Sequence, residues 1–387
     1  MLQQNSSRWT LPSDRWVLHS TPLLGNLTSR WIDVQVSAAN RFDFRLLGLE
    51  IAEGAERLPY WLLARDRLDW WLAYKGMFKS GGFSPIWLAG QFRPRPPAVV
   101  HIHYGPPAAQ LTRFAKALDR PMVVSFYGYD ATKADYTERR LWRRRYGRLF
   151  ETAGAFLAEG PAMGARLAQL GCPEHKIHVV RLPVDERALS GCERREGSDF
   201  LVVLAAALRE KKGFDTGIEA FARALKGRPD ARLLVIGDGP LAATYRSIAA
   251  AAGIEDQITW VGFLRFDELM ARLSSASVVL YPSRRAADGD SEGGAPVTLI
   301  EAQWIGVPSI VSDHDDLPFV AAPDGTVVVP PTRVDQWADA IRDLYEHRDR
   351  TSGMGVEAST FVRKHHSSAA NADARETIYE SLGGGHT

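Results

Sequence analysis

The stretch DFLVVLAAALREKKGFDTGIEAFARALKG, residues 199–227, decides the fold. It opens with a continuous apolar run from Phe200 to Leu208, which is typical of a strand buried on both faces of a sheet. A charged loop follows, and residues 215–227 then have the pattern of a helix. A strand followed by a helix is the repeating unit of a parallel sheet, so this stretch predicts an α/β protein.

The same pattern recurs along the chain of 387 residues. The predicted strands of a first sheet are 15–20, 44–49, 98–105, 121–128, 154–160 and 176–183. The predicted strands of a second sheet are 199–208, 231–239, 257–263, 277–283, 307–312 and 325–331. A polar, glycine-containing stretch at 185–199 separates the two sets. We therefore expect two Rossmann-like, doubly wound domains facing a cleft, at 1–190 and 191–364, with a helix at about 365–387 packing back on the first.

Composition excludes several classes of function. Apolar residues make up 45% and charged residues 24% of the chain, as in ordinary globular proteins. The net charge of +1 predicts no nucleic-acid partner. Cys172 and Cys192 cannot build a disulfide framework or a cysteine zinc site, which fits a reducing cytosol. The longest apolar run is about half of the ~20 residues that a spanning helix needs, so we expect a cytoplasmic protein without a membrane span.

Ligands of doubly wound sheets bind at the carboxyl ends of the strands, and the loops there contain informative residues. Arg209 and Lys212 lie between a strand and a helix, where cations form a receptor for phosphate. The alternative is a solvated charged turn. Gly237 and Gly239 follow the next strand, and small residues there allow a ligand to approach the backbone closely. The alternative is a plain Gly-Asp-Gly turn.

A third loop, SEGGAPVTLIEAQ at 291–303, carries two carboxylates. Glu292 lies in the loop, and Glu301 lies in the second turn of a helix that is expected to start at Pro296. Backbone N–H groups of residues 294–298 would point between them, ready to bind an anion. This arrangement suits a nucleotide sugar, with its phosphates in the middle and hydroxyls at both ends. The alternatives are a glycosidase acid/base pair, or two unrelated glutamates.

In this order, the motifs LREKKGF, VIGDGP, VGFL and EGGAPVTLIEAQWIGVPSIVS resemble glycosyltransferase family 4. These are retaining, GT-B-fold enzymes that use nucleotide sugars, and the resemblance is to their bacterial exopolysaccharide branch, exemplified by colanic-acid and amylovoran transferases. It is strongest over 199–331, extends to HIHYG, VSFYGYD and RLAQLGCPEHKIHVVRLPVD, and is weakest over the first 95 residues. The motifs are specific together and not singly.

The resemblance implies roles for individual residues. Lys212 matches the lysine that binds the donor diphosphate. The arginine that normally assists falls at Ala207, and we expect Arg209, two residues on, to replace it. Glu301 matches the glutamate that binds the ribose, and Glu292 matches the glutamate near the donor sugar.

The spacing of the two glutamates departs from the family. The usual pattern is E-x7-E, whereas Glu292 and Glu301 form E-x8-E, and the family spacing would fall on Gly293. A one-residue insertion, with Glu292 still the working residue, is the simplest explanation. The other donor-binding residues that the resemblance implies are Gly237, Gly239, Phe263, Leu264, Gly294, Ala295, Thr298, Gly25 and Asn26.

The resemblance also implies a set of residues that bind the acceptor. The family has a histidine near the reacting sugar, and Tyr127 stands at that position, although tyrosine does not titrate near neutral pH. His103 at a strand end is a further candidate, or a core histidine. Asp130 would bind acceptor hydroxyls or cap the next helix.

The expected function is that of a metal-independent hexosyltransferase. It would move a sugar from a UDP- or GDP-linked donor to a glycan or lipid-linked glycan in bacterial surface polysaccharide synthesis, with no cofactor. Asp288 and Asp290 form a DxD pattern, but metal-chelating DxD motifs belong to the other glycosyltransferase fold. The departures at Ala207 and Tyr127 leave a non-catalytic nucleotide-sugar-binding scaffold as an alternative, and an epimerase on the same fold is another.

One helix predicts a further partner. Residues 137–150, TERRLWRRRYGRLF, carry six arginines beside an apolar, aromatic stripe. Such a helix can lie on an anionic membrane surface, which would make the protein peripheral on the inner face of the cytoplasmic membrane. The alternative is a domain helix whose stripe faces the sheet and whose arginines are solvated.

Overall fold

The computed structural model describes residues 15–21, 23–24, 30–48, 50–51, 68–80, 84–195, 197–292 and 294–383. The chain divides into two compact units. Unit 1 comprises residues 1–159, 163–183 and 368–387, and unit 2 comprises 160–162 and 184–367. The division after Pro183 lies a few residues before the expected boundary.

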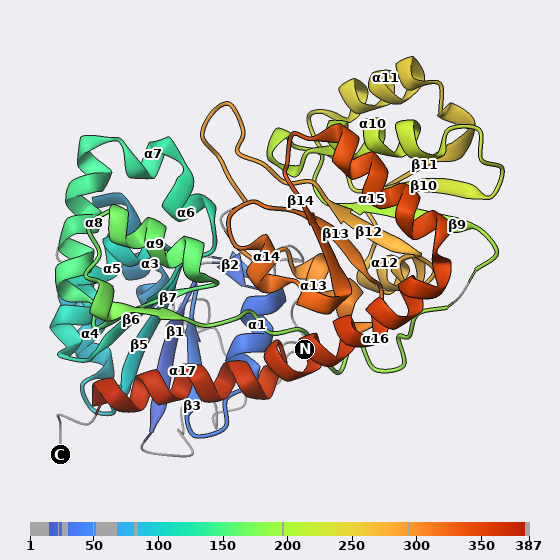
Figure 1. Cartoon of the computed structure of the whole chain (residues 1–387). Helices are drawn as coiled ribbons and strands as arrows, with labels where there is room; N and C mark the ends of the chain where they lie inside the picture. The colour runs from blue at the N-terminus through green and yellow to red at the C-terminus, as the bar shows by residue number, and fades with distance from the viewer. Residues whose placement is uncertain are drawn as a thin grey trace. The chain divides into compact units, whose positions relative to one another are not determined.

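Unit 1 is built on a six-stranded parallel sheet with the order β3-β1-β5-β6-β7-β8 (Figure 1). Its strands are β1 (Trp16–Ser20), β3 (Asp43–Leu47), β5 (Val99–His103), β6 (Met122–Ser125), β7 (Ala155–Ala158) and β8 (Ile177–Val179). All of them overlap the predicted runs. A separate parallel pair, β2 (Leu23–Leu24) and β4 (Glu50–Ile51), was not predicted.

Successive side chains of these strands point to opposite faces of the sheet, so each face has its own hydrophobic core. On one face, Leu18, Val100 and Val124 pack with α3, α4, α5 and α8. On the other, Val17 and Val99 pack with α17. The helical segments are α1 (Arg30–Ser37), α3 (Leu68–Ser80), α4 (Ser84–Phe92), α5 (Gly105–Leu118), α6 (Tyr129–Thr132), α7 (Ala134–Thr137), α8 (Arg140–Thr152), α9 (Pro161–Gln169), η3 (Glu174–Lys176) and α17 (Ser368–Gly383).

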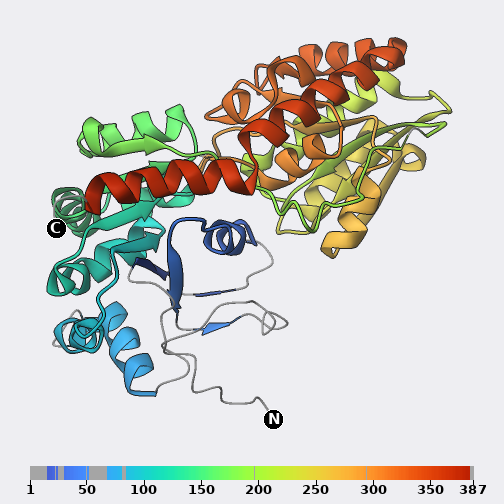
Figure 2. The same cartoon turned by 90° about the horizontal axis from the view of Figure 1, so that it is seen from below.

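The C-terminal helix α17 is part of unit 1. It runs along the sheet of this unit (Figure 2). The hydroxyl of Tyr379 lies 2.5 Å from Nδ1 of His101 in β5. The carboxylate of Glu376 accepts hydrogen bonds from the backbone N–H groups of Asn40 and Arg41 at 2.8 and 2.9 Å. These contacts join the last helix to the first third of the chain.

Unit 2 contains a second six-stranded parallel sheet, with the order β11-β10-β9-β12-β13-β14. Its strands are β9 (Phe200–Ala205), β10 (Ala231–Ile236), β11 (Ile258–Gly262), β12 (Val278–Tyr281), β13 (Ser309–Ser312) and β14 (Thr326–Val329). Each strand lies within a predicted run. The prediction of two parallel α/β sheets is therefore confirmed.

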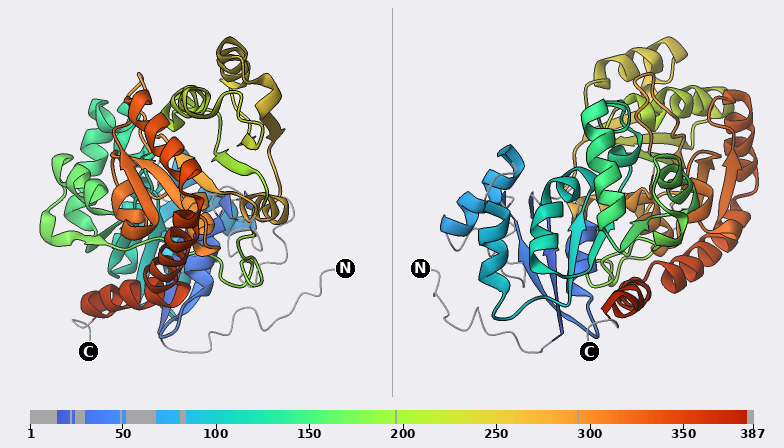
Figure 3. Two further views of the ribbon diagram at one scale, coloured as in Figure 1. Left: turned by 45° about the vertical axis from the view of Figure 1, so that its right-hand side comes forward. Right: turned by 90° about the vertical axis from the view of Figure 1, so that its left-hand side faces the viewer.

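Helices cover both faces of this second sheet, with α10 against α11 and α15 on one face and α13 against α16 on the other (Figure 3). The helical segments are η4 (Glu210–Lys212), α10 (Phe214–Leu225), α11 (Ala242–Ala252), η5 (Glu255–Gln257), α12 (Phe266–Leu273), α13 (Val297–Trp304), α14 (Leu317–Val320), η6 (Pro323–Gly325), α15 (Val334–Glu346) and α16 (Arg348–His365). Among the described residues, no helix combines the length and the apolar composition needed to span a membrane.

Candidate functional site

The strand order of unit 2 places two loops side by side at the carboxyl edge of its sheet. The order reverses between the neighbouring strands β9 and β12. Ligands of doubly wound sheets bind at such a reversal, beyond the carboxyl ends of the two strands. The loop after β9 contains Lys212 and the loop after β12 contains Glu292. The fold therefore brings these two predicted residues together.

Lys212 and Glu292 form an ion pair at the centre of the candidate site. Nζ of Lys212 donates to Oε1 of Glu292 at 2.5 Å, and 16% and 10% of the two side chains are exposed. The other oxygen, Oε2, is buried and has no hydrogen-bond partner within the described residues. A buried charged oxygen without a partner costs free energy, so this atom is suited to accept a hydrogen bond from a ligand hydroxyl. The pairing keeps Glu292 beside Lys212 despite the longer glutamate spacing, and Gly293 lies outside the described residues.

The neighbouring Lys211 holds the loop that carries Glu292. Its Nζ donates to Oδ1 of Asp290 at 3.2 Å and to the carbonyl oxygen of Ser291 at 3.1 Å. The backbone N–H of Asp290 donates to Oδ1 of Asp288 at 2.9 Å. The DxD residues are thus engaged in bracing a turn.

Two glycines allow the strand-end loops to approach each other closely. Gly213 has a φ of 64°, and a Cβ added there would lie 1.9 Å from the carbonyl oxygen of Pro282, just after β12. Gly237 has a φ of 128°, and its Cβ would lie 1.9 Å from the carbonyl oxygen of Ala206. Contacts within the protein therefore require glycine at both positions. A further approach of a ligand to Gly237 and Gly239 stays a prediction.

Arg209 projects from the same loop as Lys212 and is exposed. Within the described residues its guanidinium makes no ion pair or hydrogen bond, whereas Arg284 is bound to Asp215 at 2.9 and 2.7 Å. Arg209 is therefore available to a ligand, and Ala207 is exposed two residues before it. That Arg209 replaces the family arginine stays a prediction.

Glu301 lies in the second turn of α13 and is 7% exposed. The helix begins at Val297, so Pro296 precedes its first residue, one position away from the prediction. Oγ1 of Thr298 donates to the carbonyl oxygen of Ala205 at 3.4 Å, which links the start of α13 to the end of β9. The helix that carries Glu301 thus starts beside the strand that precedes Lys212.

The remaining predicted donor-binding residues lie in neighbouring loops. Phe263 follows β11 and is 62% exposed, so its ring is open to stacking by a flat ligand, and Leu264 beside it is partly exposed. Gly294 is buried and Ala295 is partly exposed, and Pro296 separates them from the first residue of α13. Gly25 and Asn26 lie outside the described residues. Their assignment to the donor stays a prediction.

Sequence reasoning missed a polar group next to Glu292. Oγ of Ser291 lies 2.8 Å from Nε2 of His314 and also donates to the carboxylate of Asp315. Asp315 has a φ of 47°, which is uncommon for a residue other than glycine. The only signal in the sequence was the pair His314-Asp315 after a strand. This group ties the loop after β13 to the loop that carries Glu292.

In unit 1, polar side chains meet at the carboxyl ends of β1, β5 and β6. Nδ1 of His19 lies 3.2 Å from Nε2 of His103, and Nδ1 of His103 lies 2.6 Å from the hydroxyl of Tyr127. Both ring nitrogens of His101 are also hydrogen-bonded. Nδ1 contacts the hydroxyl of Tyr379, and Nε2 lies 2.8 Å from Oγ of Ser125. The structure thus joins His103 and Tyr127, two of the predicted acceptor-side residues.

Burial favours the neutral form of these imidazoles. Burial, with a smaller effect from Arg375, lowers the pKa of His103 to about 3. Burial also lowers the pKa of His19 and His101, and it raises the pKa of Tyr127, whose hydroxyl keeps its proton. Nitrogens of the three imidazoles lie within 4.8 Å of one another, as in a metal site. Hydrogen bonds already engage both nitrogens of His101 and of His103.

Asp130 braces the loops around Tyr127. Its carboxylate accepts hydrogen bonds from the backbone N–H groups of Gly105 and Tyr127, each at 3.0 Å, and the side chain is fully buried. Burial raises the pKa of Asp130 to about 6, against the effect of these bonds. The carboxylate thus joins the first residue of α5 to the loop after β6. A role in binding acceptor hydroxyls stays a prediction.

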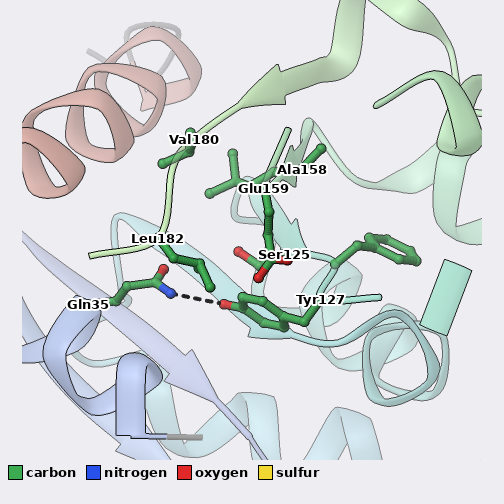
Figure 4. A pocket seen from close by; sticks show the side chains of 9 residues that line it. Gln35, Ser125, Tyr127, Ala158, Glu159, Val180 and Leu182 are labelled. Atoms are coloured by element: carbon green, nitrogen blue, oxygen red, sulfur yellow. Dashed lines mark hydrogen bonds between the residues drawn. The ribbon is translucent and has the colours of Figure 1, made fainter. Parts of the chain in front are cut away.

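A small cavity of unit 1 adjoins Tyr127 (Figure 4). Its volume is about 10 Å³, which suits about one water molecule. Nε2 of Gln35 donates to the hydroxyl of Tyr127 at 3.5 Å, and Glu159 is 4% exposed. The lining residues are Gln35, Ser125, Phe126, Tyr127, Leu157, Ala158, Glu159, Val180 and Leu182. The sequence did not identify Glu159 as a candidate, because a single acidic residue after an apolar run is not a recognisable motif.

Most apolar side chains of the arginine-rich helix α8 pack in the hydrophobic core of unit 1. Tyr146, Leu149 and Phe150 are buried, whereas Leu141 is 58% exposed and Trp142 is partly exposed. The stripe thus packs in unit 1, as the alternative of a domain helix predicts. The exposed arginines of this helix and its start are Arg139, Arg140, Arg143, Arg144 and Arg148.

Two family profiles match the chain. The one described as "Glycosyl transferases group 1" matches residues 189–359, and "Glycosyl transferase 4-like domain" matches 28–183. Together they cover most of both units.

The curated relatives that match the chain are also glycosyltransferases. The amylovoran biosynthesis glycosyltransferase AmsK of Erwinia amylovora is 33% identical over 222 residues, 57% of this chain and 54% of the relative. A GDP-mannose-dependent alpha-(1-6)-phosphatidylinositol monomannoside mannosyltransferase of Mycobacterium tuberculosis is 32% identical over 169 residues, 43% and 44% of the two chains. The matched parts thus span about half the length of these relatives.

Solved structures share the fold. HepE of Anabaena in complex with UDP-glucose superposes with a TM-score of 0.71 at 13% identity, over 95% of this chain and 99% of that one. The lipopolysaccharide outer core galactosyltransferase WaaB superposes with a TM-score of 0.66 at 14% identity, over 95% and 99%. At such low identity the likeness shows the GT-B fold alone.

Proposed function

Because the chain belongs to the group 1 glycosyltransferases, we propose that it is a retaining enzyme. It moves a hexosyl group from a UDP- or GDP-linked donor to a glycan or lipid-linked glycan in surface polysaccharide synthesis. The names of two relatives support this, since one acts in amylovoran biosynthesis and the other on a mannosylated phosphatidylinositol. The observation that carries the proposal is the Lys212–Glu292 pair at the strand reversal of unit 2, with one carboxylate oxygen unpartnered within the described residues.

Four of the predicted residues have a part in this reaction. Lys212 and Arg209 neutralise the diphosphate, Glu301 accepts hydrogen bonds from the ribose, and Oε2 of Glu292 accepts one from a hydroxyl of the donor sugar. The acceptor oxygen bonds to the anomeric carbon as the bond to the diphosphate oxygen breaks, and the acceptor proton passes to that oxygen. Since the leaving group takes the proton, the protein contributes by positioning and by electrostatic stabilisation of the departing charge, without a metal.

A thermal screen of nucleotide sugars tests the donor site. A ligand of the folded state at 100 times its Kd adds about 2.7 kcal/mol of stability, and each kcal/mol raises the Tm of a unit of this size by about 2 to 4 °C. We expect one nucleotide class to raise the transition of unit 2 by at least 5 °C. The measurement is differential scanning calorimetry with UDP- and GDP-linked hexoses.

Glu301→Ala is the test variant of that screen, and Glu357→Ala is its matched control, because Glu357 is exposed on α16. The first change should abolish the shift and the second should preserve it. If all nucleotides shift the transition equally, or if Glu301→Ala keeps the full shift, the assignment of the ribose site is wrong. A scaffold would show the shift without any turnover in a sugar-transfer assay.

We also propose a peripheral contact with an anionic membrane through the exposed arginines of α8. Each basic residue near such a surface contributes about 1 kcal/mol of attraction. With most of the apolar stripe buried, the contact is electrostatic and should weaken with salt. The changes Arg143→Glu, Arg144→Glu and Arg148→Glu together should weaken binding to phosphatidylserine vesicles by about 100-fold or more.

Liposome co-sedimentation measures this effect. The matched control carries three charge reversals at exposed positions of unit 2, namely Arg223→Glu, Lys226→Glu and Lys364→Glu. It should bind much like the unmodified protein, and vesicles of phosphatidylcholine alone should bind none of the three proteins. Equal loss in both triple variants would mean that net charge, not helix α8, governs binding.

A further inference from the structure

Four partly exposed aromatic side chains lie together beyond the strand ends of unit 1, and we refer to them as the aromatic cluster. Trp31 is at the start of α1, Tyr104 follows β5, and Tyr127 and Tyr129 follow β6. The ring centroids are 5.9 Å apart for Trp31 and Tyr127, 4.9 Å for Tyr104 and Tyr127, and 5.4 Å for Tyr104 and Tyr129. The sheet order of unit 1 reverses between β1 and β5, so Tyr104 lies where a doubly wound sheet binds its ligand.

Tyr104 holds its place in the cluster at a cost in backbone energy. Its φ is 72° and its ψ is 139°, a region that glycine occupies easily and a tyrosine does not. Residues that keep such a conformation are concentrated at ligand-binding sites, because the fold would otherwise accept glycine without strain. The strain therefore indicates that the ring and hydroxyl of Tyr104 serve a purpose that glycine could not serve.

The hydroxyl groups of the cluster are arranged to meet a polar ligand. The hydroxyl of Tyr127 is fixed by His103 and Gln35, so it presents a defined direction. The hydroxyls of Tyr104 and Tyr129 make no hydrogen bond within the part of the chain that the structure describes. Tyr129 is 37% exposed. Two hydroxyls are thus free to donate and accept beside a third that is already oriented.

Charges of both signs lie near the cluster, because the buried Arg375 acts on Tyr127 while two carboxylates act on Tyr104. The carboxylates of Asp130 and Glu159 are near enough to raise the pKa of Tyr104 in addition to the effect of burial. The charges near the cluster therefore do not select for an anion, and the aromatic faces are themselves electron-rich. Aromatic faces beside a few oriented polar groups suit a neutral ring with C–H bonds on its face and hydroxyls on its edge.

We propose that the aromatic cluster binds a pyranose ring of the acceptor, with a C–H face against the aromatic rings and hydroxyls bound by Tyr104, Tyr127 and Tyr129. The inference rests on the proposed function, and it assigns acceptor recognition to the ring of a carbohydrate. It also gives Tyr127 a new role, as an oriented hydrogen-bonding group that His103 holds in place.

Binding to a panel of octyl glycosides of glucose, galactose and mannose tests the proposal directly. Saturation-transfer NMR on the full chain should show at least one glycoside bound through its ring C–H protons. Tyr129→Ala and Tyr104→Gly should each weaken that binding by roughly three- to tenfold, the effect of losing one aromatic contact. Trp87→Ala is the matched control, because Trp87 is 36% exposed on α4 and lies outside the cluster, and it should bind as the unmodified protein does.

Two further measurements separate this proposal from loss of folding and from the proposed function. Tyr104→Gly removes the strained tyrosine, so the Tm shift caused by the nucleotide sugar should be unchanged in this variant. A preserved nucleotide shift with no glycoside bound to the unmodified protein, or with equal binding by all variants, overturns the proposal alone. Glycoside binding without any nucleotide shift would instead overturn the proposed function and leave the cluster a sugar site.

Discussion

Lys212→Ala should lower the rate of sugar transfer by about 100- to 1,000-fold, the usual effect of removing one preorganised group that stabilises charge in a transition state. The ammonium group lies 2.5 Å from Glu292 and is largely buried, so water cannot easily replace it. The same change leaves Glu292 buried without its cation, which should also disturb the group assigned to the donor sugar. The assay is the initial rate of sugar transfer from the nucleotide sugar found in the thermal screen.

Lys211→Ala is the control, because Lys211 is the adjacent lysine and is bound to Asp290 and Ser291. It should lower the Tm of unit 2 and have a smaller effect on the rate than Lys212→Ala. If Lys212→Ala retains turnover within threefold of the unmodified protein, the phosphate cradle is misplaced. If the two variants lose rate equally, the loop after β12 and not the ammonium of Lys212 is what matters.

Gly213→Ala should destabilise unit 2 by about 3 kcal/mol, which corresponds to a fall in Tm of about 6 to 12 °C. The added methyl group would lie 1.9 Å from the carbonyl oxygen of Pro282, and the backbone there has a φ of 64°. Because this contact is with backbone, relief requires the loops after β9 and β12 to separate. Separation would also move Lys212 away from Glu292, so the donor-induced thermal shift should disappear.

Gly227→Ala is the control that separates the cost of the steric contact at Gly213 from the cost of the backbone conformation. Gly227 has a φ of 78°, but a Cβ there would meet nothing within 4 Å. The change should therefore cost only the backbone term, about 1 kcal/mol, and leave the donor-induced shift intact. Differential scanning calorimetry measures both variants. Similar destabilisation by the two changes would show that backbone conformation, and not the contact with Pro282, makes Gly213 necessary.

The two sheets could be predicted from the sequence because strands and helices follow local patterns, whereas the ion pair between Lys212 and Glu292 was not predicted. An apolar run marks a buried strand wherever it occurs, and the loop after it must lie at the carboxyl edge. Lys212 and Glu292 are 80 residues apart in the chain, yet they meet because β9 and β12 are neighbours. The one-residue error at Pro296 is typical of helix ends.

The polar interior of unit 1 could not be predicted in the same way. His101 contacts Tyr379, 278 residues away, and nothing in the spacing of either residue shows which helix covers which face. Asp130 illustrates a second limit, since an acid soon after a strand can cap a helix, bind a ligand or brace neighbouring segments. Its hydrogen bonds to Gly105 and Tyr127 depend on tertiary contacts that its position in the sequence does not show. The direction of the stripe of α8 was open for the same reason.

The place of α17 has a consequence for synthesis on the ribosome. Unit 1 contains the first residues of the chain and also residues 368–387, so its sheet face around His101 is complete only after the last helix has been made. Unit 2, which lies between them in the chain, has all its strands earlier and can finish folding first. Until the C-terminal helix emerges, the first half of the protein exposes an apolar sheet face. We therefore expect C-terminal truncations to damage the N-terminal unit most.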